Sequence, residues 1–360
     1  LIAEVIVAYL LLHSSGGISF VTGFATVFTH LMNYAAHGTN FVFGNLVNGS
    51  AFSFFLNVLM PIVFISGLIG VLQYLRVLTY FIKGIGWVLA KISGMGKLES
   101  FNAVSSLTLG QSENFMIYKK VMGAISDRRM YTLAATGMST VSMAIVGAYM
   151  KLIPPEYVVT ALVLNMFSTF IVLRLINPYD YEAEQDVDEL FDYRGDHQSF
   201  FEMFGEYLLG GFKIAIIIAA MLIGFVALIS MLNDISLQVF GLSFQDILGY
   251  AFAPLAWMLH IPNNEILQAG NIMATKIVSN EIVAMFYLKK HIHEFSAHSI
   301  AVISVFLVSF ANFGSIGVIA GTIHGLNEEK GKFVARYGLR LLLGATMVSF
   351  LSALIVSIII

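Results

Sequence analysis

The feature that most constrains this chain is a series of seven apolar stretches separated by clusters of charged residues. Each stretch is long enough to cross a lipid bilayer as a helix, apart from the first, which is truncated. Only 11% of the residues are charged and 58% are hydrophobic, whereas soluble domains are about one quarter charged. We therefore expect an all-α polytopic membrane protein that has the lipid bilayer as its main solvent. The stretches cover roughly residues 1–13, 52–75, 130–151, 156–177, 208–232, 298–325 and 337–360.

Three further segments are not expected to span. Roughly 18–35 and 77–93 are amphipathic and Gly-spaced, so they are expected to lie along the membrane interface. The segment 178–206 is too rich in carboxylates to enter lipid, and we expect an aqueous loop there. Its acidic residues are Asp180, Glu182, Glu184, Asp186, Asp188, Glu189, Asp192, Asp196, Glu202 and Glu206.

Short loops rich in lysine and arginine indicate the cytoplasmic side of a membrane protein. We predict that two such loops, and the acidic loop with them, are cytoplasmic. Their basic residues are Lys119, Lys120, Arg128 and Arg129 in the first loop, and Lys330, Lys332, Arg336 and Arg340 in the second. Lys289 and Lys290 then fall outside as an exception. The net charge of −3 gives no indication of nucleic acid binding.

Two segments, 94–120 and 262–290, are too long for one pass and are interrupted near the middle by polar residues. Each ends in a pair of lysines and is followed by a span with a polar, small-residue centre, at 139–142 in the first case and 312–315 in the second. This order predicts inverted repeats, each with a re-entrant helical hairpin and a broken transmembrane helix. Such pairs mark the binding sites of secondary transporters, because irregular backbone at membrane depth persists only beside protein or a watery cavity.

Glu113 and Glu281 are the strongest individual candidates, because they lie at equivalent positions on the two predicted hairpin tips. An ionised carboxylate at membrane depth costs several kcal/mol unless it is paired or hydrated, so it usually has a function. The alternative is that each carboxylate only caps its own tip. Nearby amides and hydroxyls suit a neutral polyhydroxy or heterocyclic solute, or else they hydrogen-bond neighbouring helices. These residues are Gln111, Ser112, Asn280, Asn312 and Ser315.

Three other features are ambiguous. Phe310 is placed to stack on a ring or to gate the site, with ordinary packing as the competing explanation in a chain of thirty phenylalanines. Lys276 lies in an apolar hairpin arm, where it neutralises Glu265 or Glu281, or snorkels to the interface. A histidine cluster falls in a predicted external loop and is interpreted as solvated, so no metal site and no cofactor are expected. Its members are His291, His293 and His298.

Five motifs are long enough to be specific: GTNFVFG at 38–44, GMGKLESFNAVSSL at 94–107, GQSENF at 110–115, ATKIVSNEIVAM at 274–285 and FANFGSIG at 310–317. With these motifs the chain resembles the concentrative nucleoside transporter family, closest to its bacterial, proton-coupled branch. The resemblance implies a multi-pass protein of the bacterial inner (cytoplasmic) membrane. It also implies a homotrimer with a scaffold part, a mobile transport part and elevator-type alternating access.

The resemblance further implies a nucleoside site between the two hairpins and the two broken helices. The residues implied to contact the nucleobase are Gln111, Ser112 and Glu113, those for the ribose hydroxyls are Glu281, Asn312 and Ser315, and those lining the pocket are Ile145 and Phe310. A carboxylate that accepts hydrogen bonds from ribose hydroxyls discriminates against analogues that lack them.

The chain departs from the family pattern at the ion site. Sodium-coupled members have an Asn four residues before the hairpin-tip glycine, and this position is Ser106 here. A hard cation prefers a fuller set of oxygens than is evident, so we predict H⁺ as the coupling cation. The proton carrier is then Glu281 or Glu113, because burial favours the protonated carboxyl. Na⁺ stays an alternative, because a hydroxyl also ligates it. The remaining positions implied in coupling are Leu109, Thr140 and Val141.

The second departure is a further family span that would precede position 1 and is absent from this sequence. The expected organisation is N-terminal scaffold and interfacial helices at 1–93, a first repeat at 94–177, an acidic cytoplasmic loop at 178–206, a scaffold span with connecting helices at 207–261, and a second repeat at 262–360. We interpret the chain as a proton-driven nucleoside symporter and not as an enzyme, because no nucleophile or metal set accompanies the paired carboxylates. A passive channel and a carrier of another small neutral polar solute remain alternatives.

Overall fold

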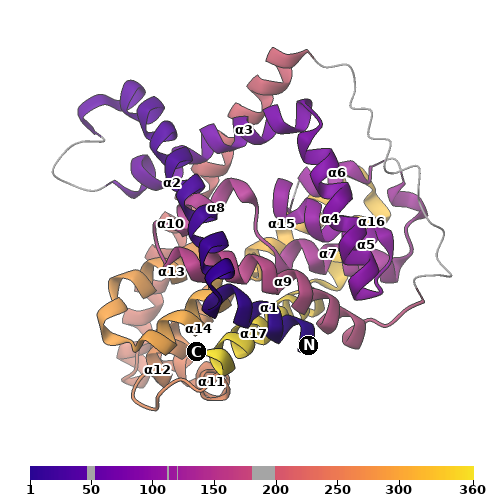
Figure 1. Cartoon of the computed structure of the whole chain (residues 1–360). Helices are drawn as coiled ribbons and strands as arrows, with labels where there is room; N and C mark the ends of the chain where they lie inside the picture. The colour runs from indigo at the N-terminus through magenta and orange to yellow at the C-terminus, as the bar shows by residue number, and fades with distance from the viewer. Residues whose placement is uncertain (47–52, 112, 120, 181–198) are drawn as a thin grey trace.

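The computed structural model describes residues 1–46, 53–111, 113–119, 121–180 and 199–360. Within these ranges every regular element is a helix, and Figure 1 shows how the helices are arranged. The first hairpin and its neighbours gather at one side of the molecule, and the second hairpin and its neighbours gather at the other. The two chain ends lie near one another, where α1 (Ile2–His13) packs on α17 (Gly338–Ile359).

The two repeats have the predicted order, which confirms the fold class. The hairpins are α5 (Lys97–Leu109) with α6 (Glu113–Ile117), and α12 (Ile266–Val278) with α13 (Glu281–Lys290); the broken helices are α7 (Asp127–Ser139) with α8 (Met143–Tyr149), and α14 (Ala297–Leu307) with α15 (Phe313–Leu326). The second break covers 308–312, a few residues before the predicted centre at 312–315. The reason is that Asn312 caps α15, which places the following three residues inside the helix.

The connecting elements complete the described chain. They are α4 (Val77–Ser93), α9 (Pro155–Ile176), α11 (Phe244–Met258), α16 (Glu328–Arg336), and the short turns η1 (Gly44–Leu46), η3 (Met122–Ala124) and η5 (Ile292–Glu294). Among the described residues, five helical segments are long and apolar enough to cross a membrane, or six if the bent pair of α1 and α2 (Ser15–Phe43) counts as one. The five segments overlap the predicted spans at 52–75, 130–151, 156–177, 208–232 and 337–360. The predicted span at 298–325 is instead two shorter apolar helices, because the second break divides it.

The predicted interfacial segment near the N-terminus is a longer helix than expected. α2 (Ser15–Phe43) is bent by 73° from α1. One of its faces is buried at Phe28 and Met32, while Val27 and Tyr34 on other faces are exposed. This one-sided burial agrees with the amphipathic pattern in the sequence.

α3 (Pro61–Tyr74) follows a π-helical segment, η2 (Phe55–Leu59), and packs along α10 (Phe200–Phe240). The contact is so close that a Cβ on Gly70 would lie 2.5 Å from the Tyr207 ring. α10 has 41 residues and is therefore about 60 Å long, roughly twice the hydrocarbon thickness of a bilayer. It is also much longer than the predicted span at 208–232.

Glu202 and Glu206, which the sequence assigned to the acidic loop, lie in the first two turns of α10. Ser199 caps this helix by accepting the backbone N–H of Glu202 at 3.3 Å. A carboxylate in the first turn also complements the helix dipole. The other acidic positions of the predicted loop, except Asp180, lie outside the described residues.

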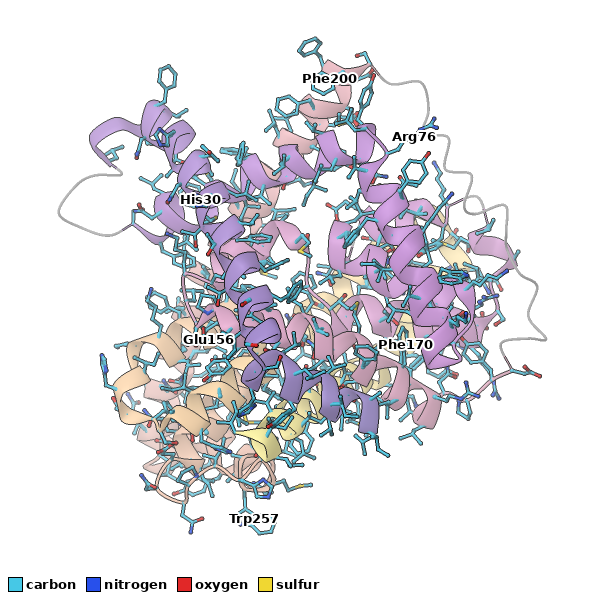
Figure 2. All side chains as sticks on the ribbon, viewed as in Figure 1. His30, Arg76, Glu156, Phe170, Phe200 and Trp257 are labelled. Carbon is cyan, nitrogen blue, oxygen red and sulfur yellow. The ribbon has the colours of Figure 1, made fainter. Side chains whose placement is uncertain are left out.

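The segments predicted to share the cytoplasmic side do meet at one end of the molecule. Lys330 Nζ lies 2.8 Å from Asp127 Oδ1, and Arg128 donates to the Pro178 carbonyl at 2.7 Å. Arg129 is an exception, since its guanidinium is buried rather than presented to solvent. The side chains drawn in Figure 2 include Trp257 on α11, which points away from the body and is 64% exposed. An exposed tryptophan of this kind suits a membrane interface.

Candidate functional site

The tip of the first hairpin is a tight turn at Gly110. This residue ends α5 with a φ of +102°, a region that other residues rarely adopt. A Cβ here would lie 3.1 Å from both Glu113 Oε2 and Ser142 Cβ. Glycine therefore allows Glu113, the first residue of α6, to approach the break of the first broken helix.

The tip of the second hairpin is built around Asn280. Its side chain accepts the N–H of Val283 at 2.9 Å, and Glu281 follows as the first residue of α13. Both predicted tip carboxylates thus begin the second arm of their hairpin, where the positive end of the helix dipole favours negative charge.

The breaks of the two broken helices touch one another. Ser142 caps α8, accepting an N–H at 3.2 Å, and Asn312 caps α15, accepting the N–H of Ser315 at 2.9 Å. Between these caps, the Phe310 N–H donates to the Thr140 carbonyl at 3.2 Å. One repeat therefore satisfies a backbone group that the break in the other leaves unpaired.

A cavity of about 220 Å³ lies where the two tips and the two breaks converge. Of the eight residues predicted to contact the substrate, seven line it and Ser112 lies outside the described residues. The seven are Gln111, Glu113, Ile145, Glu281, Phe310, Asn312 and Ser315. The sequence missed the apolar wall from α10, because an isoleucine that faces a cavity looks the same as one that faces lipid. This wall consists of Ile214, Ile217, Ile218 and Met221.

A second cavity, of about 290 Å³, adjoins the first and extends between α3 and α10 towards Gln73 and Tyr207. The two cavities share Glu113, Ser142 and part of the α10 wall. Glu113 therefore stands between a site enclosed by both repeats and a space bordered by α3 and α10.

Glu281 is held by donors from both repeats. The Tyr149 hydroxyl donates to Oε1 at 2.8 Å, and Asn312 Nδ2 donates to Oε2 at 3.0 Å. Because Asn312 Oδ1 already caps α15, its amide nitrogen necessarily faces Glu281. Glu281 is 4% exposed. Its two donors favour a carboxylate, which keeps free lone pairs for the hydroxyl groups of a ligand.

Tyr149 is a site residue that the sequence analysis missed. It lies one helical turn after Ile145, on the same face of α8, and that spacing was the only signal for it. The neighbouring residues are apolar and small, so the sequence indicates only a packing role for the tyrosine. The partner that gives it a role is 132 positions away in the sequence.

Comparison with known proteins covers almost the whole chain. The model of the Na⁺ dependent nucleoside transporter C-terminus matches residues 157–357, that of the N-terminus matches 1–46, and a nucleoside recognition (Gate) model matches 55–156. The chain belongs to the concentrative nucleoside transporter family. It is thus a member of a transporter family, and the expectation that it is not an enzyme is confirmed.

Individual members of the family are similar over nearly their full length. The purine nucleoside transport protein NupG of Bacillus subtilis is 33% identical, over 99% of this chain and 90% of that protein. The structure of CNTnw in an inward-facing substrate-bound state matches with a TM-score of 0.93 at 29% identity, covering 99% of this chain and 89% of that one. A variant of CNTnw in an outward-facing state matches with a TM-score of 0.92 at 28% identity and the same coverage.

In this transporter, Tyr149→Phe removes one donor to Glu281 without changing the volume of the side chain. A hydrogen bond to a charged group contributes about 1.5–3 kcal/mol, so we expect nucleoside kcat/KM to fall about 10-fold or more with the fold retained. Radiolabelled uptake into proteoliposomes measures this. Tyr250→Phe, at an exposed tyrosine of α11, is the control. Wild-type uptake by Tyr149→Phe would contradict the role of the hydroxyl.

Apart from Glu281, the transporter's predicted ion-coupling positions lie around the first tip and break, where oxygens of Ser106, Leu109 and Thr140 already have partners. Ser106 Oγ accepts the Asn114 amide at 2.8 Å, and the Leu109 carbonyl accepts the Ser142 hydroxyl at 3.4 Å. The Thr140 hydroxyl donates back to its own helix, and the Thr140 carbonyl accepts the Phe310 N–H. Val141, which lies between Thr140 and Ser142 in the sequence, is fully buried.

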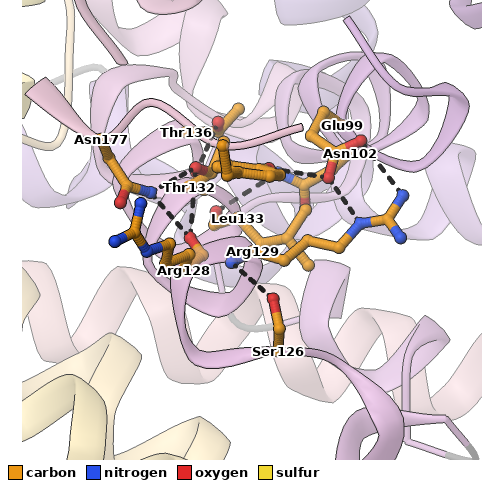
Figure 3. A network of polar contacts seen from close by, with 10 residues as sticks. Glu99, Asn102, Ser126, Arg128, Arg129, Thr132, Leu133, Thr136 and Asn177 are labelled. Carbon is orange, nitrogen blue, oxygen red and sulfur yellow. Dashed lines mark hydrogen bonds and ion pairs between the residues drawn. The ribbon is translucent and has the colours of Figure 1, made fainter. Parts of the chain in front are cut away.

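The base of the first hairpin is attached to the first broken helix by the polar network of Figure 3. Arg129 Nε lies 2.6 Å from Glu99 Oε1 and Nη2 lies 3.2 Å from Oε2, and both side chains are almost fully buried. The Tyr179 hydroxyl also donates to Glu99 at 2.9 Å, and Asn102 donates to the Leu133 carbonyl at 3.2 Å. α5 and α7 are therefore joined in a single unit through buried charges.

The prediction of a solvated loop was wrong for His298, because Ser296 caps α14 and places His298 in its first turn, half-buried, with Nε2 3.2 Å from the Ser357 carbonyl. His291 has partners nearby in the chain. His291 Nδ1 lies 2.8 Å from Glu294 Oε1, and Gln268 donates to Glu294 Oε2 at 2.7 Å. The hydrogen bonds from Gln268 and His291 lower the pKa of the exposed Glu294 carboxyl. The described part of the chain contains no group of three or more side chains that would suit a metal ion.

Proposed function

We propose that this chain is a concentrative nucleoside symporter of a bacterial inner membrane, driven by the proton gradient. The observation that carries the proposal is Glu281, a buried carboxylate held by donors from both repeats and facing the same cavity as Glu113. Two carboxylates on opposite hairpin tips suit the two ends of a nucleoside. One carboxylate accepts hydrogen bonds from the nucleobase, and the other accepts them from the hydroxyl groups of the sugar.

Each part of the nucleoside then has its own set of residues. Glu281, Asn312 and Ser315 bind the ribose hydroxyls, and Gln111 and Glu113, together with Ser112, bind the nucleobase. Ile145 and Phe310 line the pocket on the faces of the ring. The nucleoside transport named for the NupG relative supports this assignment.

Proton coupling is favoured over sodium coupling by the chemistry at the first break. A sodium ion needs several oxygen lone pairs directed at it, and one of the two lone pairs of the Ser106 hydroxyl already accepts an N–H from Asn114. A proton needs only one titrating carboxylate, and Glu281 and Glu113 are both available in the cavity. We assign the coupling role to Glu281, since it contacts both repeats.

We further propose elevator-type alternating access in a homotrimer. The two hairpins and two broken helices form the mobile part, and α3 with α10 forms the scaffold, with the cavity on the boundary between them. Inward-facing and outward-facing states are recorded for CNTnw, which supports alternating access. The largely exposed apolar surface of α10 leaves room for contact with lipid and with neighbouring copies.

The test is uptake of radiolabelled uridine and adenosine into proteoliposomes, with a pH gradient and a sodium gradient imposed separately. Accumulation driven by the pH gradient alone supports the proposal, and accumulation only with sodium rejects proton coupling. Flux without accumulation would indicate a channel. No nucleoside flux, or competition by an unrelated polar solute but not by nucleosides, would reject the substrate class.

Ser106→Ala tests whether a proton or a sodium ion drives uptake, because it removes the hydroxyl that would bind sodium. If protons drive uptake, the hydroxyl only accepts an internal hydrogen bond, which contributes about 1 kcal/mol to stability. We therefore expect the ion dependence and nucleoside KM of Ser106→Ala to match the wild type, with slightly lower thermal stability. A loss of sodium-driven uptake in Ser106→Ala would instead identify Ser106 as a sodium ligand.

A further inference from the structure

Lys276 is a fully buried lysine on the first arm of the second hairpin, and all three of its ammonium protons have acceptors. Nζ donates to the Phe306 carbonyl at 2.5 Å, to Ser309 Oγ at 2.7 Å and to Ser349 Oγ at 3.0 Å. Nζ also lies 4.5 Å from the centroid of the Phe306 ring, within the range of a cation–π contact. The side chain therefore neither snorkels nor forms a direct ion pair with Glu265 or Glu281.

The oxygens around Lys276 are of the kind that bind a coupling cation in other transporters. Phe306 is in the last turn of α14, where carbonyls lack an intrahelical partner and carry the negative end of the helix dipole. Ser309 belongs to the break itself. Carbonyls at the end of a half-helix, with nearby hydroxyls, are typical ligands of a bound cation at membrane depth.

The same contacts hold the break in shape. Ser309 Oγ, besides accepting from Lys276, lies 2.7 Å from Ser349 Oγ on α17 and accepts the Ala311 N–H at 3.4 Å. Ala311 lies between Phe310 and Asn312, both of which line the cavity. The ammonium is therefore connected through Ser309 to the segment that contacts substrate.

The charge of Lys276 also acts on Glu281, since the two groups attract one another electrostatically within the same hairpin. In the first repeat, the corresponding position is Leu107 when counted from the last residue of the hairpin arm and Thr108 when counted from the tip carboxylate, so the lysine has no counterpart there. The two breaks are therefore chemically different, since among the described residues the second break contacts a lysine from its own hairpin and the first does not.

We propose that Lys276 is a tethered cation, which occupies an ion site in the second break and thereby positions Phe310 and Asn312 for substrate. Its ammonium takes the place of a bound monovalent cation, so this break carries its own cationic group and needs none from solution. Removal of the side chain uncovers a site for a monovalent cation made of the Phe306 carbonyl and the hydroxyls of Ser309 and Ser349. The positioning role rests on the proposed nucleoside function, whereas the ion site does not.

The test compares Lys276→Ala, which empties the site, with Lys276→Met, which fills it with a neutral chain of similar length. Melting temperature in detergent is measured without nucleoside, with sodium, potassium, methylammonium or choline chloride at constant ionic strength. We expect Lys276→Ala to melt below the wild type and to be restabilised by methylammonium or an alkali cation but not by choline. Lys276→Met and the wild type should not respond.

Nucleoside binding supplies the second readout. We expect the nucleoside Kd to rise about 10-fold or more in both variants, and in Lys276→Ala alone to recover with the same cation that restores melting. Lys290→Ala, at an exposed lysine that ends the same hairpin, is the control for loss of charge.

Two outcomes would overturn the proposal. One is a wild-type Kd in Lys276→Met, which remains decisive if Lys276→Ala does not fold. The other is a lowered melting temperature of Lys276→Ala that no small cation raises, which would mean that the lysine side chain only fills space. If the wild type binds no nucleoside, the proposed function fails, but the cation-dependent melting of Lys276→Ala still tests the ion site.

Discussion

Glu281→Gln is expected to abolish concentrative nucleoside uptake while leaving the protein folded. The amide keeps one acceptor for Tyr149 or Asn312 but loses the charge that strengthens their hydrogen bonds and, in the proposed site, those of the ribose hydroxyls. Each hydrogen bond to an ionised group contributes about 1.5–3 kcal/mol. Weakening the hydrogen bonds from two ribose hydroxyls therefore corresponds to a factor of about 100 or more in the affinity for nucleoside. Proteoliposome uptake and size-exclusion chromatography measure the two halves of this prediction.

The same variant separates ribose binding from proton carriage. If Glu281 only binds ribose, raising the nucleoside concentration restores accumulation. If it also carries the proton, saturating nucleoside restores exchange of labelled for unlabelled substrate but not accumulation. In addition, a deoxynucleoside should bind wild type more weakly than a ribonucleoside, and this difference should shrink in Glu281→Gln.

Glu294→Gln is the matched control, because its carboxylate is exposed and lies at the far end of the same hairpin. It should transport like the wild type. If both Glu281→Gln and Glu294→Gln accumulate nucleoside like the wild type, Glu281 neither binds ribose nor carries the proton.

Glu99→Gln is expected to destabilise the folded transporter by about 3–5 kcal/mol, the usual cost of removing one partner of a buried ion pair. The variant leaves the Arg129 guanidinium, which is almost fully buried, without its carboxylate. Because Arg129 joins the first broken helix to the first hairpin, we also expect the nucleoside Kd to rise. Chemical unfolding in detergent micelles measures the free energy of unfolding.

The double variant Glu99→Leu, Arg129→Met tests whether the effect comes from the unpaired charge. It removes both charges, so it should be more stable than Glu99→Gln. The exposed pair of Lys332 and Glu328, 2.5 Å apart and 68% exposed on each side, is the control. Glu328→Gln should cost less than about 1 kcal/mol. Equal stability of Glu99→Gln and Glu328→Gln would contradict the structural importance of the buried pair.

Much of the site could be predicted, because its signals are local and have a clear physical cause. Gly110, the tip carboxylates and the polar caps interrupt otherwise apolar helices, and polarity at membrane depth is costly enough to be informative. The tips were placed correctly on this basis. The second break was placed too late, because Asn312 was interpreted as the centre of the break although it caps the following helix.

The residues that were missed depend on contacts between distant parts of the chain. Tyr149 reads as packing until Glu281, from the other repeat, is placed against its hydroxyl. Lys276 admits three interpretations in the sequence, and none of them gives its contacts: it attracts Glu281 only at a distance, and its hydrogen-bond partners are a helix end and two serines. The α10 isoleucines face the cavity only because α10 crosses beside both repeats.

The sequence by itself determined the class of this protein, the order of its hairpins and broken helices, and the polar residues at the tips and breaks, whereas the lining roles of Ile145 and Phe310 were implied only by the family resemblance. The class, the order and the polar positions follow from the free energy of placing apolar and polar groups in lipid, which acts residue by residue along the chain. The tertiary structure alone decided which polar groups meet: Tyr149 with Glu281, Lys276 with the second break, Asn114 with Ser106. A hydrogen bond depends on the distance and direction between two groups, and for groups in different helices only the packing of those helices sets them.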